Sequence, residues 1–409
     1  MIKSLNQHRP PIQCRFAANL CSAALLIMFF QVAHAVQDCE INGRAINTSN
    51  GFETAGKTGL VRCKDRDSGQ VEREYEMRNG QSLGLSRYFR GGKLYREFTT
   101  GANGAHEDLE REWAANGQLV LEFTNVNGRA RGLRRQWFDD GKPRKFEWLG
   151  ENASDGALVE FRANGQLASL RCGPRPMLEP HANDGKLCGF DSAPSTVKLY
   201  SAKGDLRSTV VLAAGIEQKA TTFYANGKPE REEELLLRGT QSRETQYAED
   251  GGKRREKLWD LSSGRPALLL RDEEFHASGT RVAERHYSVV VDARGRKYSR
   301  LASEARFYLN GQPQQKDLYT PDGNTELRDT QRYTDQGKLS QQGRYLLEGR
   351  HGERPVGVHQ RYFANGKQAR EDYFDAKGKL ARQKVWDESG KLLSDDELFE
   401  DGSRKAFSK

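Results

Sequence analysis

The chain has 409 residues, of which 36% are hydrophobic and 30% are charged, so it has too few apolar residues for one large globular core. Aromatic residues make up 9% and recur at regular positions, whereas disordered chains are poor in them. The formal charge of +8 falls to about +5 without the three basic residues of 1–35, which is too weak for a dedicated nucleic-acid surface, so we expect no nucleic-acid partner.

Residues 1–35 resemble a secretory signal peptide. Three basic residues precede an apolar run at 20–30, and Ala33-His34-Ala35 forms a small-x-small cleavage site. The run is short for a bilayer span, and an uncleaved membrane anchor is the alternative. We therefore expect a mature chain that starts at Val36, is exported to the periplasm or secreted, and has no stable membrane insertion.

Four cysteines follow residue 36 and form two sequence-local pairs. Cys39 and Cys63 are neighbouring cysteines in the sequence, and so are Cys172 and Cys188. In an oxidising compartment such pairs predict two disulfides. A zinc site is the alternative, but these cysteines form no Cys-x-x-Cys knuckles, so we expect neither a metal nor any other cofactor.

Turn-forming glycines divide most of the chain into units of similar length. Between Tyr88 and Gly402 they recur at a nearly constant interval, as at Gly366, Gly378 and Gly390. Each unit, of roughly a dozen residues, is long enough for one strand and one tight turn. This predicts an all-β fold, an elongated antiparallel β-meander or hairpin repeat array. Over much of the chain an aromatic residue precedes only alternate turns, so the two edges of the sheet should differ in chemistry.

The same pattern predicts the domain organisation. An N-terminal cap at 36–70, closed by the first disulfide, precedes a first repeat block at 71–170. Three prolines interrupt the strand rhythm in the segment 171–195, so we expect a disulfide-closed loop insertion there. A second repeat block follows at 196–409.

Two stretches carry a resemblance to a known family. They are NGRARGLRRQWFDDGK, from Asn127 to Lys142, and ERPVGVHQRYFANGK, from Glu353 to Lys367. Their shared pattern, aromatic-x-x-(Asn/Asp)-Gly-Lys, resembles the MORN-repeat variant family, in which some bacterial members are described as antitoxin-like. The resemblance covers most of Tyr88 to Gly402. It implies β-hairpin arrays that act as binding or scaffold surfaces and carry no catalytic residue.

Two short segments match catalytic patterns without the structural setting those patterns need. Residues 51–58 fit a phosphate-binding loop, but no buried strand pattern precedes them and no helix pattern follows. Residues 80–84 fit a nucleophile elbow, but they lie between a repeat turn and another expected strand. We therefore expect no catalytic residue and no enzymatic activity.

Adjacent aromatic residues end several of the expected strands, as in Tyr362-Phe363. Because neighbouring strand residues point to opposite faces, each pair should place one ring on each face of the sheet. One ring would pack across strands, and the other either packs as well or, beside an arginine, faces a ligand. The arginines are alternatively solubilising. The candidate ligand-facing residues are Tyr88, Trp113, Trp137, Phe161, Tyr362, Arg134, Arg135 and Arg361.

These features favour an exported, non-enzymatic surface for protein binding or scaffolding. An antitoxin or immunity-like role is one form of this expectation, and it rests on the resemblance. A cell-wall or polysaccharide-binding module that uses the aromatic rows is the alternative. The identity of the partner and the oligomeric state stay open at this point.

Overall fold

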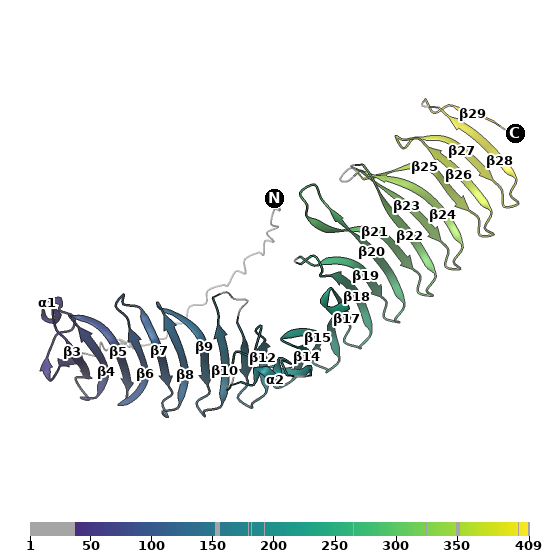
Figure 1. Cartoon of the computed structure of the whole chain (residues 1–409). Coiled ribbons are helices and arrows are strands. Elements are labelled where there is room, and N and C mark those ends of the chain that lie inside the picture. Colours follow the sequence, from purple (N-terminus) through teal and green to yellow (C-terminus); the bar gives the residue numbers. More distant parts are fainter. Residues whose placement is uncertain are drawn as a thin grey trace, which may run out of the picture.

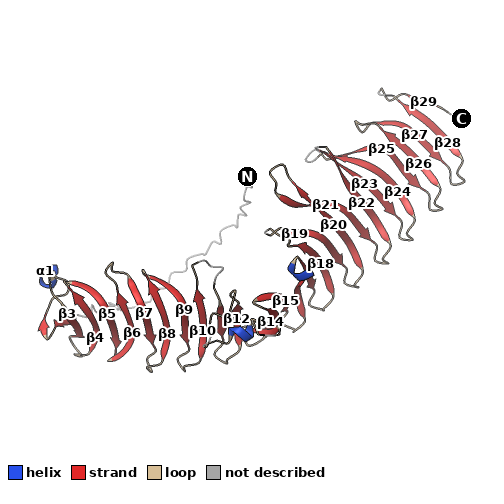
Figure 2. Cartoon of the chain, in the orientation of Figure 1, coloured by secondary structure: helices blue, strands red, loops and turns tan. Residues whose placement is uncertain are grey.

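The computed structural model describes residues 37–151, 156–178, 180, 182–191, 193–264, 266–323, 325–348, 352–399 and 401–407. The expected signal peptide at 1–35 lies outside these residues. The described part is nearly all β-structure (Figure 2), which confirms the predicted fold class. None of the helices in this part is long and apolar enough to cross a bilayer.

Two antiparallel sheets follow one another along the chain and form a curved strip (Figure 1). The first has 12 strands in the order β12 to β3, then β1 and β2, and the second has 17 strands, β13 to β29, in sequence order. Consecutive strands pair throughout most of both sheets, so the chain is the expected meander with one break, between β12 and β13.

The bounds of the elements are as follows. The first sheet consists of β1 Gln37–Ile41, β2 Arg44–Ala45, β3 Gly59–Asp65, β4 Val71–Arg78, β5 Gln81–Arg90, β6 Lys93–Thr100, β7 His106–Trp113, β8 Leu119–Val126, β9 Arg129–Trp137, β10 Pro143–Leu149, β11 Leu158–Phe161 and β12 Leu167–Arg171. The second consists of β13 Ser195–Tyr200, β14 Leu206–Ala213, β15 Ile216–Phe223, β16 Pro229–Leu236, β17 Gln241–Tyr247, β18 Lys253–Asp260, β19 Leu268–Phe275, β20 Arg281–Val291, β21 Lys297–Phe307, β22 Pro313–Asp322, β23 Thr325–Tyr333, β24 Leu339–Leu347, β25 Glu353–Tyr362, β26 Gln368–Phe374, β27 Leu380–Trp386, β28 Leu392–Leu398 and β29 Arg404–Ala406. The helical turns are α1 Gly51–Thr54, α2 Asp184–Leu187 and η2 Leu237–Gly239.

One edge of the sheets carries the aromatic signature, and we call it the aromatic edge. Its turns span five residues, as at 114–118, where the Ala114 N–H donates to the Gln118 carbonyl (2.8 Å). Gly117 has a φ of +87°, a conformation that a Cβ disfavours. The strand register shifts just before this turn, between Glu112 and Trp113, which is the bulge that such turns produce.

The opposite edge mixes two turn types, so the predicted chemical difference between the edges holds only in part. Its turns at 101–105 and 375–379 have the same five-residue pattern as the aromatic edge, whereas others are tighter. Asn79-Gly80 has φ values of 51° and 82°, and Asn127-Gly128 has 52° and 74°. Two successive positive φ values identify type I′ turns, whose twist matches that of the flanking strands. Asn followed by Gly suits this turn because both residues tolerate positive φ.

Asparagine and lysine side chains join successive turns along the aromatic edge. Asn365 Oδ1 accepts the Lys367 N–H within its own turn (2.9 Å), and Asn365 Nδ2 donates to the Glu388 carbonyl in the next turn (2.9 Å). Lys367 Nζ donates to the Ser389 carbonyl (2.6 Å). The same arrangement recurs at Asn226, Lys228 and Asn310. The Asn-Gly-Lys motif therefore shapes one turn and also fastens it to its neighbour.

Replacing Asn365 with alanine should lower the free energy of unfolding by about 1–2 kcal/mol, because two hydrogen bonds are lost. Asn365→Asp keeps the Oδ1 acceptor and loses the Nδ2 donor, so it should cost roughly half as much. Denaturant unfolding of both variants measures the difference. An Asp variant as stable as the original chain would show that the bond to the next turn contributes nothing.

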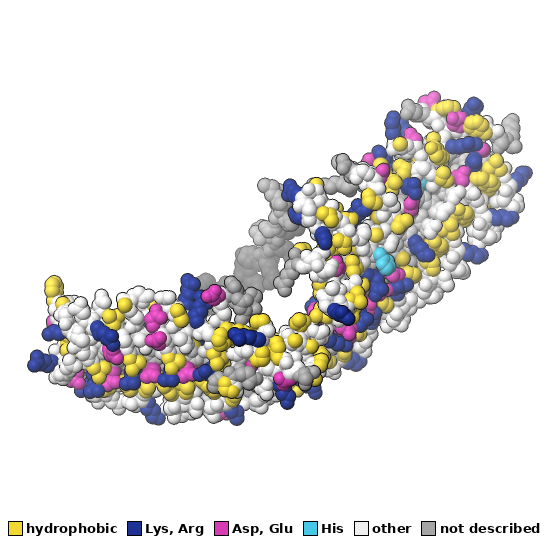
Figure 3. All heavy atoms as spheres, viewed as in Figure 1, with side chains coloured by type: hydrophobic (Ala, Val, Ile, Leu, Met, Phe, Trp, Pro, Cys, Tyr) yellow, Lys and Arg dark blue, Asp and Glu magenta, His cyan; other side chains and the backbone are white. Residues whose placement is uncertain are grey.

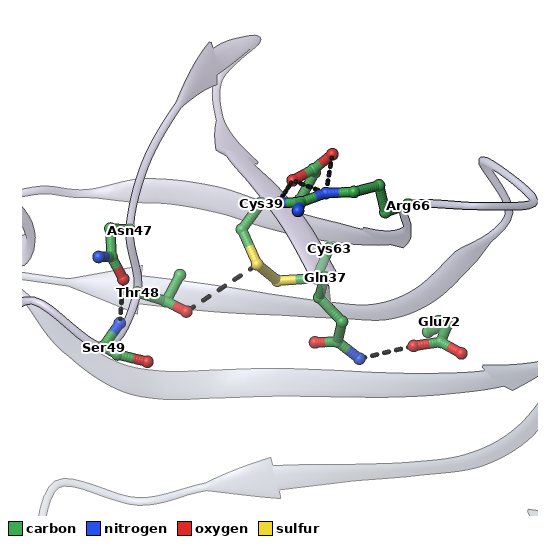
Figure 4. The surroundings of a disulfide bond; sticks show 9 residues. Gln37, Cys39, Asn47, Thr48, Ser49, Cys63, Arg66 and Glu72 are labelled. Carbon is green, nitrogen blue, oxygen red and sulfur yellow. Dashed lines mark hydrogen bonds and ion pairs between the residues drawn. A yellow bond between two sulfur atoms is a disulfide. The ribbon is translucent and has the colours of Figure 1, made fainter. Parts of the chain in front are cut away.

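The N-terminal cap belongs to the first sheet. Cys39 on β1 lies opposite Cys63 on β3, with 4.0 Å between the Cα atoms, and the two form the expected disulfide (Figure 4). Arg66 and Asp38 form an ion pair beside it at 2.7 Å. The small core around the disulfide consists of Ile41, Ile46, Val61, Cys63, Tyr75 and Met77. Because β3 also pairs with β4, the cap and the first repeat block share one continuous sheet.

The main hydrophobic core lies where the two sheets meet. Phe146 on β10 is 1% exposed, and Val159 on β11 is fully buried. They pack in one cluster with Val197 of the second sheet and with Leu178 and Ala182 of the connecting segment. The connection between β12 and β13 therefore supplies part of the core and is more than a linker.

This connecting segment also holds the two sheets together. Cys172 directly follows β12 and forms the second expected disulfide with Cys188. The carbonyl of Cys188 accepts the Gly215 N–H (2.9 Å), and that of Gly189 accepts the Ala214 N–H (2.7 Å). Residues 214 and 215 form the β14–β15 turn. The disulfide thus joins the end of the first sheet to residues 188 and 189, and the carbonyls of these two residues bind the β14–β15 turn of the second sheet.

The molecule exposes an unusually large surface for its mass. The chain has 27499 Å² of accessible surface, whereas a compact monomer of 46.2 kDa has about 16,000 Å². Subtracting about 6,000 Å² for 36 fully extended residues, as an upper bound for 1–36, still leaves a clear excess. The accessible surface is this large because each sheet is largely a single layer, so both faces of most strands are exposed to solvent.

Candidate functional site

A row of alternating charges crosses the first sheet, and we call it the charge ladder. Its members are cross-strand neighbours on β1 and β3 to β9: Glu40, Arg62, Glu74, Arg87, Glu97, Arg111, Glu122 and Arg135. Acidic and basic side chains alternate along this sheet in Figure 3. The ion pairs include Arg62–Glu74 at 2.7 Å and Arg111–Glu122 at 2.8 Å.

The charge ladder is a stabilising feature of the sheet. Each opposite-charge pair across two strands contributes about 0.2–1 kcal/mol, and each charge inside the row has an opposite neighbour on both sides. The ladder ends where Arg135 lies opposite Phe146 of the core. Sequence reasoning singled out Arg135 as a ligand-facing residue, but its Nη1 instead forms an ion pair with Glu122.

We expect the charge ladder to make the stability of the first sheet fall in acid. Burial alone would raise the pKa of Glu122, but the hydrogen bonds and charges of Arg111 and Arg135 outweigh it and hold the pKa below its ordinary value. A carboxylate with a lowered folded-state pKa contributes stability above its unfolded pKa and loses it as the pH falls through the folded pKa. Glu122→Gln should therefore be less stable than the original chain at neutral pH, and its stability should fall less below about pH 4.5.

Denaturant unfolding between about pH 7 and pH 3 measures this difference. Glu230→Gln, an exposed position on β16, is the control and should keep the original pH profile. Parallel profiles of the Glu122→Gln variant and the original chain would contradict the prediction.

The structure distributes the predicted ligand-facing residues over both sheets and does not bring them into one site. Tyr88, Trp113, Trp137, Phe161 and Tyr362 are all half-buried. The Tyr88 ring stacks on Phe98 with 5.8 Å between the centroids, and Trp137 meets Phe146 edge-on at 6.0 Å. Phe161 packs against the main core. Tyr88, Trp137 and Phe161 are therefore used for packing.

The three predicted arginines are also separated. Arg134 lies over the Phe123 ring, 5.4 Å from its centroid, and Arg135 belongs to the charge ladder. Arg361 is exposed on β25 in the second sheet, far along the chain from the other two. Tyr362 lies next to Arg361 on the same strand.

The expectation of one aromatic ring on each face is wrong for the pairs at these turns. Phe307 ends β21, and the register shifts between Arg306 and Phe307, so the next ring, Tyr308, lies in the turn. Tyr308 Oη donates to the Tyr333 carbonyl at 2.9 Å. Tyr224 Oη donates to the Tyr247 carbonyl in the same way (2.7 Å). The second ring thus joins neighbouring turns because the strand has already ended.

A groove of 810 Å³ crosses β20 to β25 of the second sheet, and we call it the β20–β25 groove. One wall is a row of cross-strand neighbours: Glu284, Ala305, Lys316, Gln331, Gln342 and Gln360. The other wall is formed by His286, Ser303, Leu318, Asp329 and Arg344, with Val358 beyond them. The two rows belong to alternate positions of the same strands, so they lie on one face, with backbone between them.

The charged side chains of this groove compensate one another. Asp329 and Arg344 face each other across β23 and β24, with 2.6 Å from Nε to Oδ1 and 2.9 Å from Nη2 to Oδ2. Glu284 pairs with Arg281 at 2.9 Å and meets His286 Nε2 at 2.8 Å. Lys316 Nζ lies 5.5 Å from the centroid of the Tyr333 ring. The two rows carry two acids and two bases, and Glu304 and Asp317 also line the groove. Glu304 pairs with Arg285 at 3.1 Å, and Asp317 accepts from Gln315 at 2.7 Å.

Three glutamine side chains form a hydrogen-bonded series along one wall, which we call the amide row. Gln331 Nε2 donates to Gln342 Oε1 (3.4 Å), and Gln342 Nε2 donates to Gln360 Oε1 (2.6 Å). Gln360 Nε2 then donates to Glu371 Oε2 on β26 (2.9 Å), and this hydrogen bond lowers the pKa of Glu371. Sequence reasoning missed this row, because each of its members comes from a different strand and no local motif links them.

The segments with catalytic-looking patterns have other structures. Residues 51–58 contain the one-turn helix α1, which Asn50 caps by accepting the Phe52 N–H at 3.0 Å, and residues 46–50 before it contain no strand. Residues 80–84 form the end of a turn and the start of β5. Both cysteine pairs are disulfides, so those four sulfur atoms are not thiolate ligands for zinc. Among the described residues, no group of three or more His, Cys, Asp or Glu could hold a metal ion.

Comparisons with known proteins give no family. The sequence matches no family model, and a search among curated proteins finds no match. A chain in the crystal structure of TcdB2-TccC3-Cdc42 aligns with 84% of this chain and 18% of its own length, at 9% identity and a TM-score of 0.17. A porin-like protein from Bacteroides uniformis aligns with 53% of this chain and 88% of its own length, at 9% identity and a TM-score of 0.18. Both scores are too low to support an argument about function.

Proposed function

We propose that this chain is an exported, non-enzymatic β-repeat protein that binds another protein or holds it as a scaffold. The observation that carries the proposal is the β20–β25 groove on an open sheet face. Leu318 and Val358 in its walls are 54% and 47% exposed, in the same groove as the Asp329–Arg344 ion pair. Exposed apolar side chains gathered in a groove are typical of surfaces that exchange water for a partner.

The proposed location follows from the disulfides and the N-terminal sequence. Two disulfides fit an extracellular or periplasmic environment, where oxidising conditions maintain them. The signal-peptide pattern of 1–35 adds export and cleavage to this proposal. The resemblance to MORN-repeat variants supports an antitoxin or immunity-like role as one form of the binding function.

We favour a protein over a polysaccharide as the partner of this chain. The alternative function depends on aromatic rows that offer flat rings to sugars, but the five predicted rings are half-buried. A stacked sugar needs the face of a ring, and one face of the Tyr88 ring is stacked on Phe98.

Mass spectrometry of the native protein should find Val36 as its first residue. The basic residues, the apolar run and the Ala33-His34-Ala35 site place the cleavage there. A native protein that retains the apolar run at 20–30 would contradict export with cleavage and favour the membrane-anchor alternative.

Cross-linking in the envelope fraction, followed by affinity purification, tests the binding function. We expect one protein to co-purify with the original chain and to be lost with Leu318→Arg, which places a charge in the groove. Leu309→Arg is the control, because Leu309 is 59% exposed in the β21–β22 turn outside the groove. Equal recovery with both variants, or recovery of cell-wall glycan without protein, would overturn the proposal.

A further inference from the structure

The spacing of the groove selects the conformation of an extended ligand. Neighbouring strands lie about 4.8 Å apart, so side chains on alternate strands lie about 9.6 Å apart along the groove. One turn of polyproline II helix, three residues, rises about 9.3 Å and matches this spacing. A ligand in the β-strand conformation repeats every two residues, at about 6.6 Å, and does not match the spacing of about 9.6 Å. The six strands β20 to β25 span about 24 Å, room for about eight residues of polyproline II.

The amide row selects ligands by their hydrogen-bonding groups. A glutamine amide has two N–H donors and an oxygen that accepts two bonds. Gln360 Oε1 accepts from Gln342 Nε2 (2.6 Å) and from Tyr362 Oη (2.9 Å), so it is saturated. One Gln360 N–H bonds to Glu371, which leaves the other without a partner among the described residues. An N–H donor therefore remains at this end of the row.

The opposite end of the row offers a second donor. Gln331 Oε1 accepts from Tyr333 Oη at 2.7 Å, and one Gln331 N–H points to Gln342. Its other N–H also lacks a partner within the described part of the chain. Gln331 lies on β23 and Gln360 on β25, so the two donors are separated by the two-strand spacing of about 9.6 Å. A polyproline II chain would present a carbonyl to each of them, one turn apart.

We propose that the β20–β25 groove binds a proline-rich segment of a partner protein in the polyproline II conformation, an inference that rests on the proposed protein-binding function. Such a segment has backbone carbonyls without internal partners, and its prolines have no N–H to satisfy. Its proline residues carry no charge, so they leave the Asp329–Arg344 ion pair of the groove intact. The exposed side chains of Leu318 and Val358 supply apolar contact for the proline rings. A polysaccharide brings hydroxyl donors as well as acceptors, and it matches two remaining donors less well.

Fluorescence anisotropy with a labelled proline peptide of about ten residues tests the proposal on the full chain with both disulfides intact. We expect saturable binding that weakens about tenfold in Gln331→Met, which removes one exposed donor without adding charge. Gln312→Met, an exposed turn position outside the groove, should bind like the original chain. A Gly-Ser peptide of equal length, which lacks the preformed conformation, should bind at least tenfold more weakly.

Three results would overturn the inference: no saturable binding, equal binding of the Gly-Ser peptide, or unchanged affinity in Gln331→Met. Saturable binding of a neutral β-linked glucan oligosaccharide that Gln331→Met abolishes would replace it with a glycan site. If the peptide fails while Leu318→Arg still loses its cross-linked protein, the function stands and this ligand is wrong. If both tests fail, the proposed function falls as well.

Discussion

Replacing Phe146 with alanine should lower the free energy of unfolding by about 3–5 kcal/mol, the largest effect that we expect from one substitution. Phe146 is 1% exposed and lies in the one core that contains residues of both sheets and of the connecting segment, among the residues that the structure describes. Its removal leaves a cavity that rigid β-strands on either side cannot fill. Elsewhere the sheets are thin, so the chain has little other buried apolar surface to offset the loss.

Denaturant unfolding followed by circular dichroism measures this cost. Phe52→Ala is the matched control, because the same side chain is 97% exposed on α1, and it should change stability by less than about 0.5 kcal/mol. A loss below about 1 kcal/mol in Phe146→Ala would show that the contact between the sheets is not a principal source of stability.

Removing the Cys172–Cys188 disulfide should both destabilise the chain and change its shape. A cross-link that closes a loop of this length contributes about 3 kcal/mol, chiefly by restricting the unfolded chain. In the folded chain, the same link connects the end of β12 to a segment whose carbonyls bind the β14–β15 turn. The Cys172→Ser/Cys188→Ser variant should therefore sample a wider range of angles between the sheets.

Small-angle X-ray scattering separates these two effects. The pair-distance distribution of the Cys172→Ser/Cys188→Ser variant should broaden, whereas Cys39→Ser/Cys63→Ser should lose a similar amount of stability and keep the original distribution. The second pair is the control because Cys39 and Cys63 join neighbouring strands within one sheet. Identical scattering from both variants and the original chain would show that the core alone sets the angle between the sheets.

The local chemistry of the sequence was sufficient to predict the repeat unit. A turn is specified within four or five residues, by Gly at positive φ and by Asn or Asp before it, so Asn127-Gly128 or Asn365-Gly366 is recognisable without knowledge of distant residues. The disulfides were predictable for a related reason. Cys39 and Cys63 are separated by one excursion of the chain, as are Cys172 and Cys188, and few alternative partners exist.

The side chains that meet across strands were not predictable in this way. Many strands end in a register shift, and a shift of one residue moves every later side chain to the other face. For this reason Tyr308 lies in a turn and not on the face opposite Phe307. The same shifts decide that Gln331, Gln342 and Gln360 form one row, although each lies on a different strand.

The sequence by itself therefore determined the strands, the turns and the disulfide pairs, because each depends on residues that are close along the chain. The tertiary structure alone decided the β20–β25 groove, the charge ladder and the core between the sheets. Each of these combines one or two residues from many strands, and its composition depends on the accumulated register of all the strands between them. The cluster of Phe146, Val197 and Leu178, where the two sheets meet, likewise combines residues that no local pattern brings together.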